Sequence, residues 1–211
     1  SALEVGPHGS NFTVTHNGQD LGQIQMPQPG RYNAMNALVA ATAAISLGVT
    51  FEAVQKGLST YQGLENRFTV VDVGNVRVVK DYISHPTGMR RVLAAAKTLS
   101  DGPVIAIFKP YRFTMIHYLG DEYAVAFKDA DHVVITELYT AGEVPIAGVD
   151  APWLVQKIRD TGTDVTFLPE MDDIPDYLVK RLTAGQQLIF FGGDDLFRLA
   201  DALIERVEAL G

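Results

Sequence analysis

The chain has 211 residues, of which 47% are hydrophobic, and it carries a formal net charge of −8 at pH 7 and no cysteine. This length fits one large domain or two small ones, each with a real core. The acidic balance argues against nonspecific nucleic-acid binding, which needs a basic face. No apolar run approaches the roughly 20 residues that cross a bilayer, and the lack of cysteine excludes disulfides and thiolate metal sites. We therefore expect a cytoplasmic protein with no nucleic-acid or membrane partner.

The N-terminal third predicts a hairpin followed by two helices. Apolar and polar residues alternate over 12–16 and 21–26, on both sides of Asn17-Gly18, which is a strong turn signal. The spacing of apolar residues then predicts helices over 30–48 and 51–61. A polar connector at 63–67 follows, and we place a domain boundary there.

From residue 68 onwards strands alternate with helices. Two strands, 68–73 and 76–80, flank Gly74-Asn75. After them the pattern predicts helices over 86–99, 116–128, 151–161, 174–182 and 196–210, separated by strands over 104–108, 132–136, 164–168 and 188–191. This alternation favours an α/β fold with right-handed crossovers and a doubly wound, mostly parallel sheet. Several of the strands are apolar on both faces, as a sheet covered by helices on both sides requires.

Polar side chains gather just after four of these strands, in Asp81–His85, Lys109–Arg112, Glu137–Glu143 and Gly192–Asp195. Because ligands of open α/β sheets bind beyond the carboxyl ends of the strands, we expect these loops to line one rim. Each loop has a plainer interpretation beside this one. Asp81 and Ser84 are also suited to capping the next helix, and Gly192–Asp195 favours a glycine turn with an aspartate N-cap. Lys109 and Arg112 fit an anion clamp and solvated loop charges equally.

No complete catalytic motif accompanies this rim. The chain has no Walker A loop, no G-x-S-x-G elbow and no G-x-G-x-x-G after a strand. His85 stands out among five histidines because it lies between a strand and Pro86, but it has no partner at metal-ligand spacing, so no metal site is expected. From the residues alone we predict a binding rim.

Six segments, in the same order, resemble motifs of the Mur ligase family. They are GRYNAMNALVAA, GLENRF, VVKDYISHPTGM, FKPYRFT, ELYTAGEVPIAGVD and FFGGDDL. The fifth segment is most similar to the alanine-adding branch of the family. Departures from the family's pattern fall mostly on the substrate side, at Tyr32, Lys80, Ser84, Tyr111, Met115 and Asp194.

The resemblance implies a domain organisation and an activity. Residues 1–67 would be a small α+β remnant of the family's central ATPase domain, and residues 68–211 its Rossmann-like C-terminal domain. The parent would be a ligase of peptidoglycan precursor synthesis that uses ATP and Mg²⁺ to join L-alanine to UDP-N-acetylmuramate. ATP and Mg²⁺ would be held mainly by N-terminal and central domains outside this sequence, so we expect no turnover by this chain alone. The alternative is a diverged, non-catalytic nucleotide- or ligand-binding module.

The resemblance also implies roles for individual residues. Nucleotide contacts are assigned to Asn33 and Asn36 for adenine, Arg67 for the phosphates and Asp81 for the ribose. The amino-acid and acyl-phosphate side is assigned to Tyr82, Ser84, His85, Tyr111 and Arg112. Of these, His85 and Arg112 are the candidate catalytic residues, and Arg112 would bind the incoming carboxylate.

Overall fold

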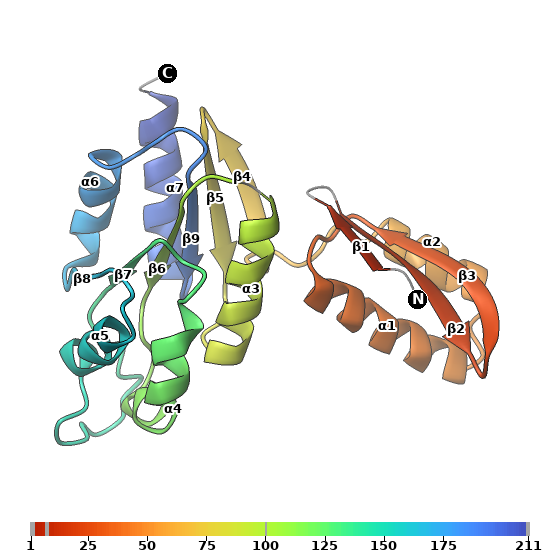
Figure 1. The fold of residues 1–211 in the computed structure, drawn as a ribbon, viewed down its shortest axis with the longest axis horizontal. Coiled ribbons are helices and arrows are strands. Elements are labelled where there is room, and N and C mark those ends of the chain that lie inside the picture. The colour runs from red at the N-terminus through yellow and green to blue at the C-terminus, as the bar shows by residue number, and fades with distance from the viewer. Residues whose placement is uncertain (1–2, 7–8, 100, 210–211) are drawn as a thin grey trace. The chain divides into compact units, whose positions relative to one another are not determined.

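The structure is a computed structural model that describes residues 3–6, 9–99 and 101–209 (Figure 1). The chain divides into two compact units, Ser1–Leu64 and Glu65–Gly211. We describe each unit by itself.

The first unit is built on an antiparallel sheet of β1 (Leu3–Gly6), β2 (Gly9–His16) and β3 (Gln19–Met26). The predicted hairpin is confirmed: β2 and β3 pair around Asn17 and Gly18, whose φ angles of 51° and 80° are the positive values that such a turn needs. Strand β1 was not predicted, because its four residues are too short for a clear alternation.

Two helices pack against this sheet, α1 (Arg31–Ser46) and α2 (Phe51–Ser59). Thr50 caps α2, since its hydroxyl accepts a hydrogen bond from the amide of Ala53 at 3.3 Å. The buried core of the unit consists of small and medium side chains from both layers: Phe12, Val14, Ile24, Met26, Ala34, Ala37, Ala41 and Val54. The alanines of α1 allow that helix to lie close to the strands.

The second unit contains a six-stranded sheet in the order β4-β5-β9-β6-β7-β8. Only the β4–β5 pair is antiparallel, so the predicted mostly parallel sheet is confirmed. The strands are β4 (Thr69–Val73), β5 (Val76–Asp81), β6 (Val104–Phe108), β7 (His132–Ile135), β8 (Val165–Phe167) and β9 (Gln187–Phe191). Every residue of β6 and β9 is buried, as expected for central strands covered on both faces.

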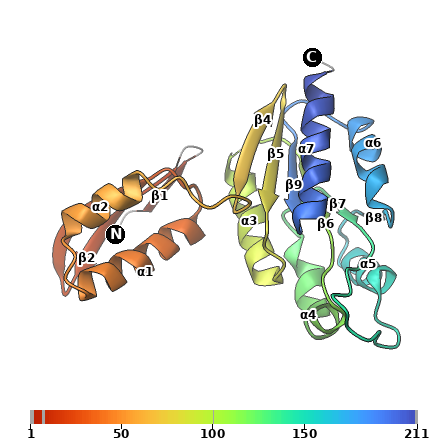
Figure 2. The ribbon, with the colours of Figure 1, turned by 180° about the vertical axis from the view of Figure 1, so that it is seen from behind.

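Helices cover both faces of this sheet, which confirms the doubly wound, Rossmann-like architecture. Helices α3 and α4 lie on one face and α6 and α7 on the other, as Figures 1 and 2 show from opposite sides. The helical segments are α3 (Pro86–Leu99), α4 (Phe113–Ala126), α5 (Ala151–Asp160), the 3₁₀ turn η1 (Met171–Asp173), α6 (Ile174–Val179) and α7 (Asp194–Glu208). None of the helices among the described residues is long and apolar enough to cross a membrane.

Two helix starts in the second unit differ from the prediction by two or three residues, and both differences bear on the site. Helix α4 begins at Phe113 rather than at residue 116, and α7 begins at Asp194 rather than at residue 196. Helix α4 starts directly after the polar loop Lys109–Arg112, whereas α7 starts within the polar segment Gly192–Asp195, so that Asp194 and Asp195 lie in its first turn. Both loops are therefore shorter than predicted.

The order of the strands creates a switch point at β9. The connection from β5 to β6 passes through α3 on one face, whereas β9 lies between them and continues into α7 on the other face. Where neighbouring strands lead to helices on opposite faces, the loops separate and leave a crevice at the carboxyl edge. The fold thus predicts a crevice, and a candidate site, where β5, β9 and β6 end.

Candidate functional site

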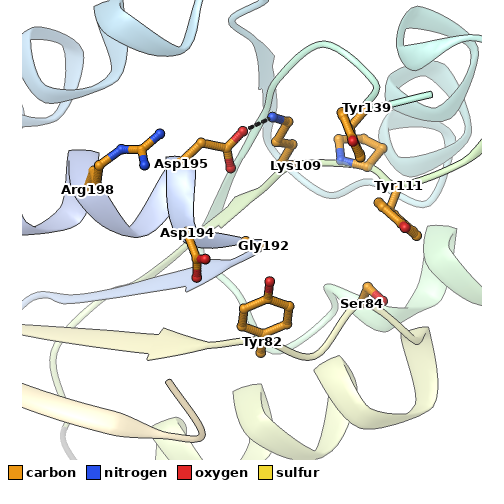
Figure 3. A pocket seen from close by; sticks show the side chains of 11 residues that line it. Tyr82, Ser84, Lys109, Tyr111, Tyr139, Gly192, Asp194, Asp195 and Arg198 are labelled. Atoms are coloured by element: carbon orange, nitrogen blue, oxygen red, sulfur yellow. Dashed lines mark hydrogen bonds and ion pairs between the residues drawn. The ribbon is translucent and has the colours of Figure 1, made fainter. Parts of the chain in front are cut away.

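A pocket of about 580 Å³ lies at this carboxyl edge (Figure 3). It is lined by Tyr82, Ser84, Lys109, Pro110, Tyr111, Tyr139, Gly192, Gly193, Asp194, Asp195 and Arg198. These residues follow β5, β6, β7 and β9, so the four polar loops singled out in the sequence contribute to one pocket.

The floor of the pocket depends on two glycines between β9 and α7. A Cβ atom at Gly192 would lie 2.7 Å from Leu196 Cδ2 and 3.3 Å from Leu196 Cβ, so a side chain here would require Leu196 to shift. Gly193 is the N-cap of α7 and provides no side-chain cap. The predicted aspartate N-cap was therefore wrong: Asp194 and Asp195 are the first two helical residues.

An ion pair between Lys109 and Asp195 joins the loops after β6 and β9. The Lys109 side chain is only 14% exposed, and its ammonium nitrogen lies 5.2 Å from the centroid of the Tyr139 ring. Burial alone would raise the pKa of the Asp195 carboxyl, but Lys109 and the amide of Leu196, 2.8 Å from Oδ1, outweigh it and lower that pKa. Asp195 is thus held as a carboxylate.

Tyrosines form the apolar walls of the pocket. The rings of Tyr111 and Tyr139 stack with centroids 5.5 Å apart, and a parallel bridge joins their backbones. On the opposite side Tyr82 meets Phe197 edge to face at 5.6 Å. In Figure 3 the Tyr82 hydroxyl points toward Gly192 and Asp194. The pocket therefore combines three aromatic faces with a few polar groups, a composition typical of small-molecule sites.

Arg112 and Glu143 fasten the loop after β7 to the start of α4. Arg112 is the N-cap of α4 and has a left-handed backbone, with φ 65°. Glu143 accepts hydrogen bonds from the hydroxyl of Thr114 at 2.6 Å and from its amide at 3.0 Å, which together lower the pKa of the Glu143 carboxyl. The Arg112 guanidinium lies 3.7 Å from Glu143 and 3.4 Å from the Tyr111 hydroxyl. Arg112 is thus engaged beside the pocket and is not among its lining residues.

Asp81 is buried at the end of β5, with 3% of its surface exposed. Its two carboxylate oxygens accept hydrogen bonds from the amides of Phe68 at 3.1 Å and Ile83 at 2.9 Å. Burial raises the pKa of Asp81, and these amides together with the charge of Arg67 counter part of that rise. Asp81 therefore fixes the turn after β5 to the segment that precedes β4, and does not cap α3.

The turn residues after Asp81 divide between two tasks. His85 is exposed and caps α3, since its Nδ1 accepts a hydrogen bond from the amide of Thr87 at 3.3 Å. Ser84 lines the pocket, while its carbonyl accepts a hydrogen bond from the hydroxyl of Tyr123. Of the two residues predicted to be possible caps, neither Asp81 nor Ser84 makes a described side-chain bond to α3; His85 makes it instead.

The structure brings together only part of the predicted set. Tyr82, Ser84 and Tyr111 line the pocket, whereas Asp81, His85 and Arg112 adjoin it without lining it. Arg67 is exposed in the turn before β4. The roles assigned to these residues stay predictions.

Asn33 and Asn36 belong to the first unit. Both lie in the first turns of α1, where Asn36 is exposed and the Asn33 side-chain amide donates to the carbonyl of Pro29 at 2.7 Å. This bond uses one amide hydrogen of Asn33 and leaves its carbonyl oxygen for another donor. Their assignment to adenine stays a prediction.

Eight lining residues were not assigned a role from the sequence: Lys109, Pro110, Tyr139, Gly192, Gly193, Asp194, Asp195 and Arg198. All of them except Arg198 lie in the polar loops singled out in the sequence. Tyr139 lies in a loop that the sequence did mark as polar, so its position could have been anticipated. Arg198 lies in the second turn of α7, four residues beyond Asp194. Residues four apart lie on the same face of a helix, so the position of Asp194 at the rim indicates that Arg198 also lies near the rim.

Lys80 replaces an acidic residue of the family's motif and has its own structural partner. Its ammonium group pairs with Asp201 of α7 at 2.8 Å, and its side chain is 12% exposed. Among the described residues, no group of three or more His, Cys, Asp or Glu side chains is arranged to hold a metal ion.

The fold and the pocket together define a class: a doubly wound α/β domain with a pocket at its switch point. Comparison with known proteins identifies the family. Residues 66–193 match the family model described as "Mur ligase, glutamate ligase domain", so the chain belongs to the Mur ligase family.

Two relatives extend this match over nearly the whole chain. A UDP-N-acetylmuramate–L-alanine ligase of Symbiobacterium thermophilum is 37% identical over 204 residues, which are 95% of this chain and 42% of the relative. One of Phenylobacterium zucineum is 37% identical over 215 residues, covering 99% of this chain and 45% of the relative. The chain thus spans less than half the length of these relatives and corresponds to their C-terminal portion.

A solved structure shows the same fold. The UDP-N-acetylmuramate-alanine ligase of Thermotoga maritima superposes with a TM-score of 0.82 at 22% identity, over 100% of this chain and 45% of that one.

Proposed function

We propose that this chain provides the amino-acid side of an ATP-dependent ligase that joins L-alanine to UDP-N-acetylmuramate in peptidoglycan precursor synthesis. One observation carries the proposal: the pocket lies at the switch point of a Mur ligase domain, and the alanine-ligase relatives match the chain beyond that domain, at 37% identity over 95% of its length. The pocket has the size and the mixed aromatic and polar lining of a small-molecule site.

The pocket residues suit an amino acid better than a nucleotide. Tyr82, Tyr111 and Tyr139 provide apolar surface for a short side chain. The Ser84 hydroxyl is able both to donate and to accept a hydrogen bond. Because Lys109 and Asp195 already form an ion pair, they fix the shape of the pocket.

Only a few residues of this chain, all outside the pocket lining, are candidates to contact ATP. The exposed Arg67 suits a phosphate, and the amides of Asn33 and Asn36 suit an adenine edge. Asp81 does not fit a ribose in this conformation, because it is buried and both its carboxylate oxygens bind backbone amides. When bound, ATP would activate a carboxylate as an acyl phosphate, with Mg²⁺ neutralising the phosphoryl charge. The magnesium ligands would come from outside the described residues.

The proposal is tested by phosphate release. The complete protein, expressed from the reading frame that encodes this chain, is expected to release phosphate only when ATP, UDP-N-acetylmuramate and L-alanine are all present. The purified 211-residue chain is expected to release none. Release by the chain alone, or release by the complete protein that does not depend on L-alanine, would contradict the proposal.

The departures from the family's pattern support one alternative, a non-catalytic ligand-binding module. Lys80 makes an ion pair where the motif has an acid, and Ser84 and Met115 replace a histidine and an arginine. A reading frame without a Walker A motif upstream of this chain would favour the alternative. In that case the chain would still bind its ligand, with no phosphate release by the complete protein.

A further inference from the structure

The cations around the carboxyl edge are not equally available to a ligand. Lys109 is paired with Asp195, and Lys80 with Asp201. Arg112 is engaged by Glu143 and by the Tyr111 hydroxyl. An incoming anion would have to compete with an aspartate at each lysine, and Arg112 is not among the residues that line the pocket.

The N-terminus of α7 is also occupied. Its first-turn amides would ordinarily attract an anion, but Asp195 provides one from within the chain. The Asp195 carboxylate accepts from the amide of Leu196 at 2.8 Å and also from its own amide. The helix terminus and Lys109 therefore neutralise the same carboxylate, and neither is the natural receptor for a second one.

Arg198 is the cation that remains. It lines the pocket from the second turn of α7 (Figure 3), and within the described part of the chain its guanidinium makes no hydrogen bond or ion pair. Asp194, four residues earlier, lines the same pocket, and no ion pair joins the two in the described structure. Opposite charges at this spacing generally attract each other along a helix. Here both keep their bonding capacity for a ligand.

We propose that Arg198 binds the carboxylate of the amino acid, an inference that rests on the proposed function. The planar guanidinium matches a carboxylate in a two-point hydrogen-bonded arrangement. The three tyrosines line the same pocket as Arg198 and provide its apolar surface. The negative charge of Asp194 nearby opposes a second carboxylate, so the site favours an amino acid with a neutral side chain.

The test is a set of titrations of the 211-residue chain, followed by NMR or calorimetry. The probes are L-alanine, propionate (no amino group), L-alaninamide (no carboxylate) and inorganic phosphate. The variants are Arg198→Gln, Arg198→Lys and Arg206→Gln, the last of which removes a charge from the same helix at its pair with Asp176. Circular dichroism of each variant verifies the fold.

For the unaltered chain we expect L-alanine and propionate to bind at least tenfold more tightly than L-alaninamide, since only they carry the anion. Arg198→Gln is expected to weaken the binding of L-alanine and of propionate about tenfold and to leave the binding of L-alaninamide unchanged. Arg198→Lys should fall between, because it keeps the charge and loses the planar fork. Arg206→Gln should bind like the unaltered chain.

Equal binding of L-alanine by Arg198→Gln and the unaltered chain would overturn the inference. So would a pocket that binds phosphate through Arg198 and not propionate, or one that binds neither. These outcomes are separate from the proposed function, which is read from phosphate release by the complete protein. Release that depends on L-alanine and is unaffected by Arg198→Gln would refute the inference alone, and binding through Arg198 without release would refute the function alone.

Discussion

The two edges of the parallel sheet are built in different ways. At the amino edge, polar groups mostly bind the protein's own backbone: Asp131 accepts from the amide of Val104 at 2.7 Å, and the Gln187 side chain donates to the carbonyl of Ala96 at 2.9 Å. His132 contacts both Asp164 and Tyr177 there. Side chains at this edge are used to close turns.

At the carboxyl edge Asp81 also binds backbone amides, but several other polar groups line a pocket instead. Arg198 and Asp194 have no partner among the described side chains, and the loops contain Arg112 and Ala141 with positive φ angles of 65° and 52°. Non-glycine residues in this region cost free energy and are tolerated where the surrounding contacts hold them. Substitutions at the amino edge should therefore change stability, and those at the carboxyl edge should change ligand binding.

The largest effect is expected from Gly102→Ala at the amino edge. A Cβ atom there would lie 1.9 Å from the carbonyl oxygen of Gly185, and backbone on both sides would have to move. We expect a loss of about 3 kcal/mol or more in the free energy of unfolding, measured in urea. Gly193→Ala at the carboxyl edge is the control, because its nearest atoms are 3.7 Å away. A loss below about 1 kcal/mol for Gly102→Ala would refute the close-approach argument.

Asp131→Ala should have the next largest effect. Burial raises the pKa of Asp131, but Lys97 and the amide of Val104 outweigh it, so that its pKa is lowered in the folded state. Its stabilisation is then present above the unfolded pKa of about 4 and is lost as pH falls through the lower folded pKa. We expect Asp131→Ala to lose about 1–2 kcal/mol at pH 7, and the difference to shrink in acid. Unfolding measured from pH 7 to 2.5 tests this, and a difference that does not depend on pH would contradict it.

Much of this architecture could be predicted from the sequence because the hydrophobic pattern determines it. The apolar segment 104–108 is a strand with the predicted bounds, and 86–99 is a helix with the predicted bounds. The starts of α4 and α7 were less accessible to prediction. They depend on the left-handed backbone of Arg112 and on Gly193 as the N-cap of α7. Tertiary contacts determine these backbone conformations, and the spacing of hydrophobic residues does not reveal them.

The site could be predicted in outline and not in its pairings. Strand order was not known from the sequence, yet all parallel strands end at one edge, so the four loops had to meet there. Which charges remain unpaired is decided by distances between loops far apart in sequence, such as Lys109 and Asp195. For that reason the family resemblance implied Arg112 for the carboxylate, whereas the pocket lining led us to propose Arg198.

Lys109→Met probes the carboxyl edge with a smaller effect on stability. Without the ammonium group, only the amides of Leu196 and of Asp195 itself would oppose the effect of burial on Asp195, so we expect its pKa to rise. The loss in unfolding free energy should be about 1 kcal/mol, while L-alanine binding should weaken as the loops after β6 and β9 separate. NMR titration of the Asp195 carboxyl carbon measures the pKa. Lys157→Met, which removes a pair with the 91% exposed Asp121, is the control.

The smallest and most local effect is expected from Glu143→Gln. An amide keeps one acceptor oxygen for Thr114 but has no charge for Arg112, so the loop after β7 should loosen where it meets α4. Hydrogen exchange at the Thr114 amide should become faster, whereas Glu122→Gln, exposed on the same helix, should leave it unchanged.

In the unaltered chain the Thr114 amide should lose protection from exchange as pH falls through the lowered pKa of Glu143. The negative charge of the Glu143 carboxylate attracts Arg112 and strengthens the hydrogen bonds from Thr114, and protonation removes that charge. The urea midpoint should not change in Glu143→Gln. A lower urea midpoint would mean that the loop after β7 contributes to global stability. It would contradict the expectation that substitutions at the carboxyl edge mainly change ligand binding.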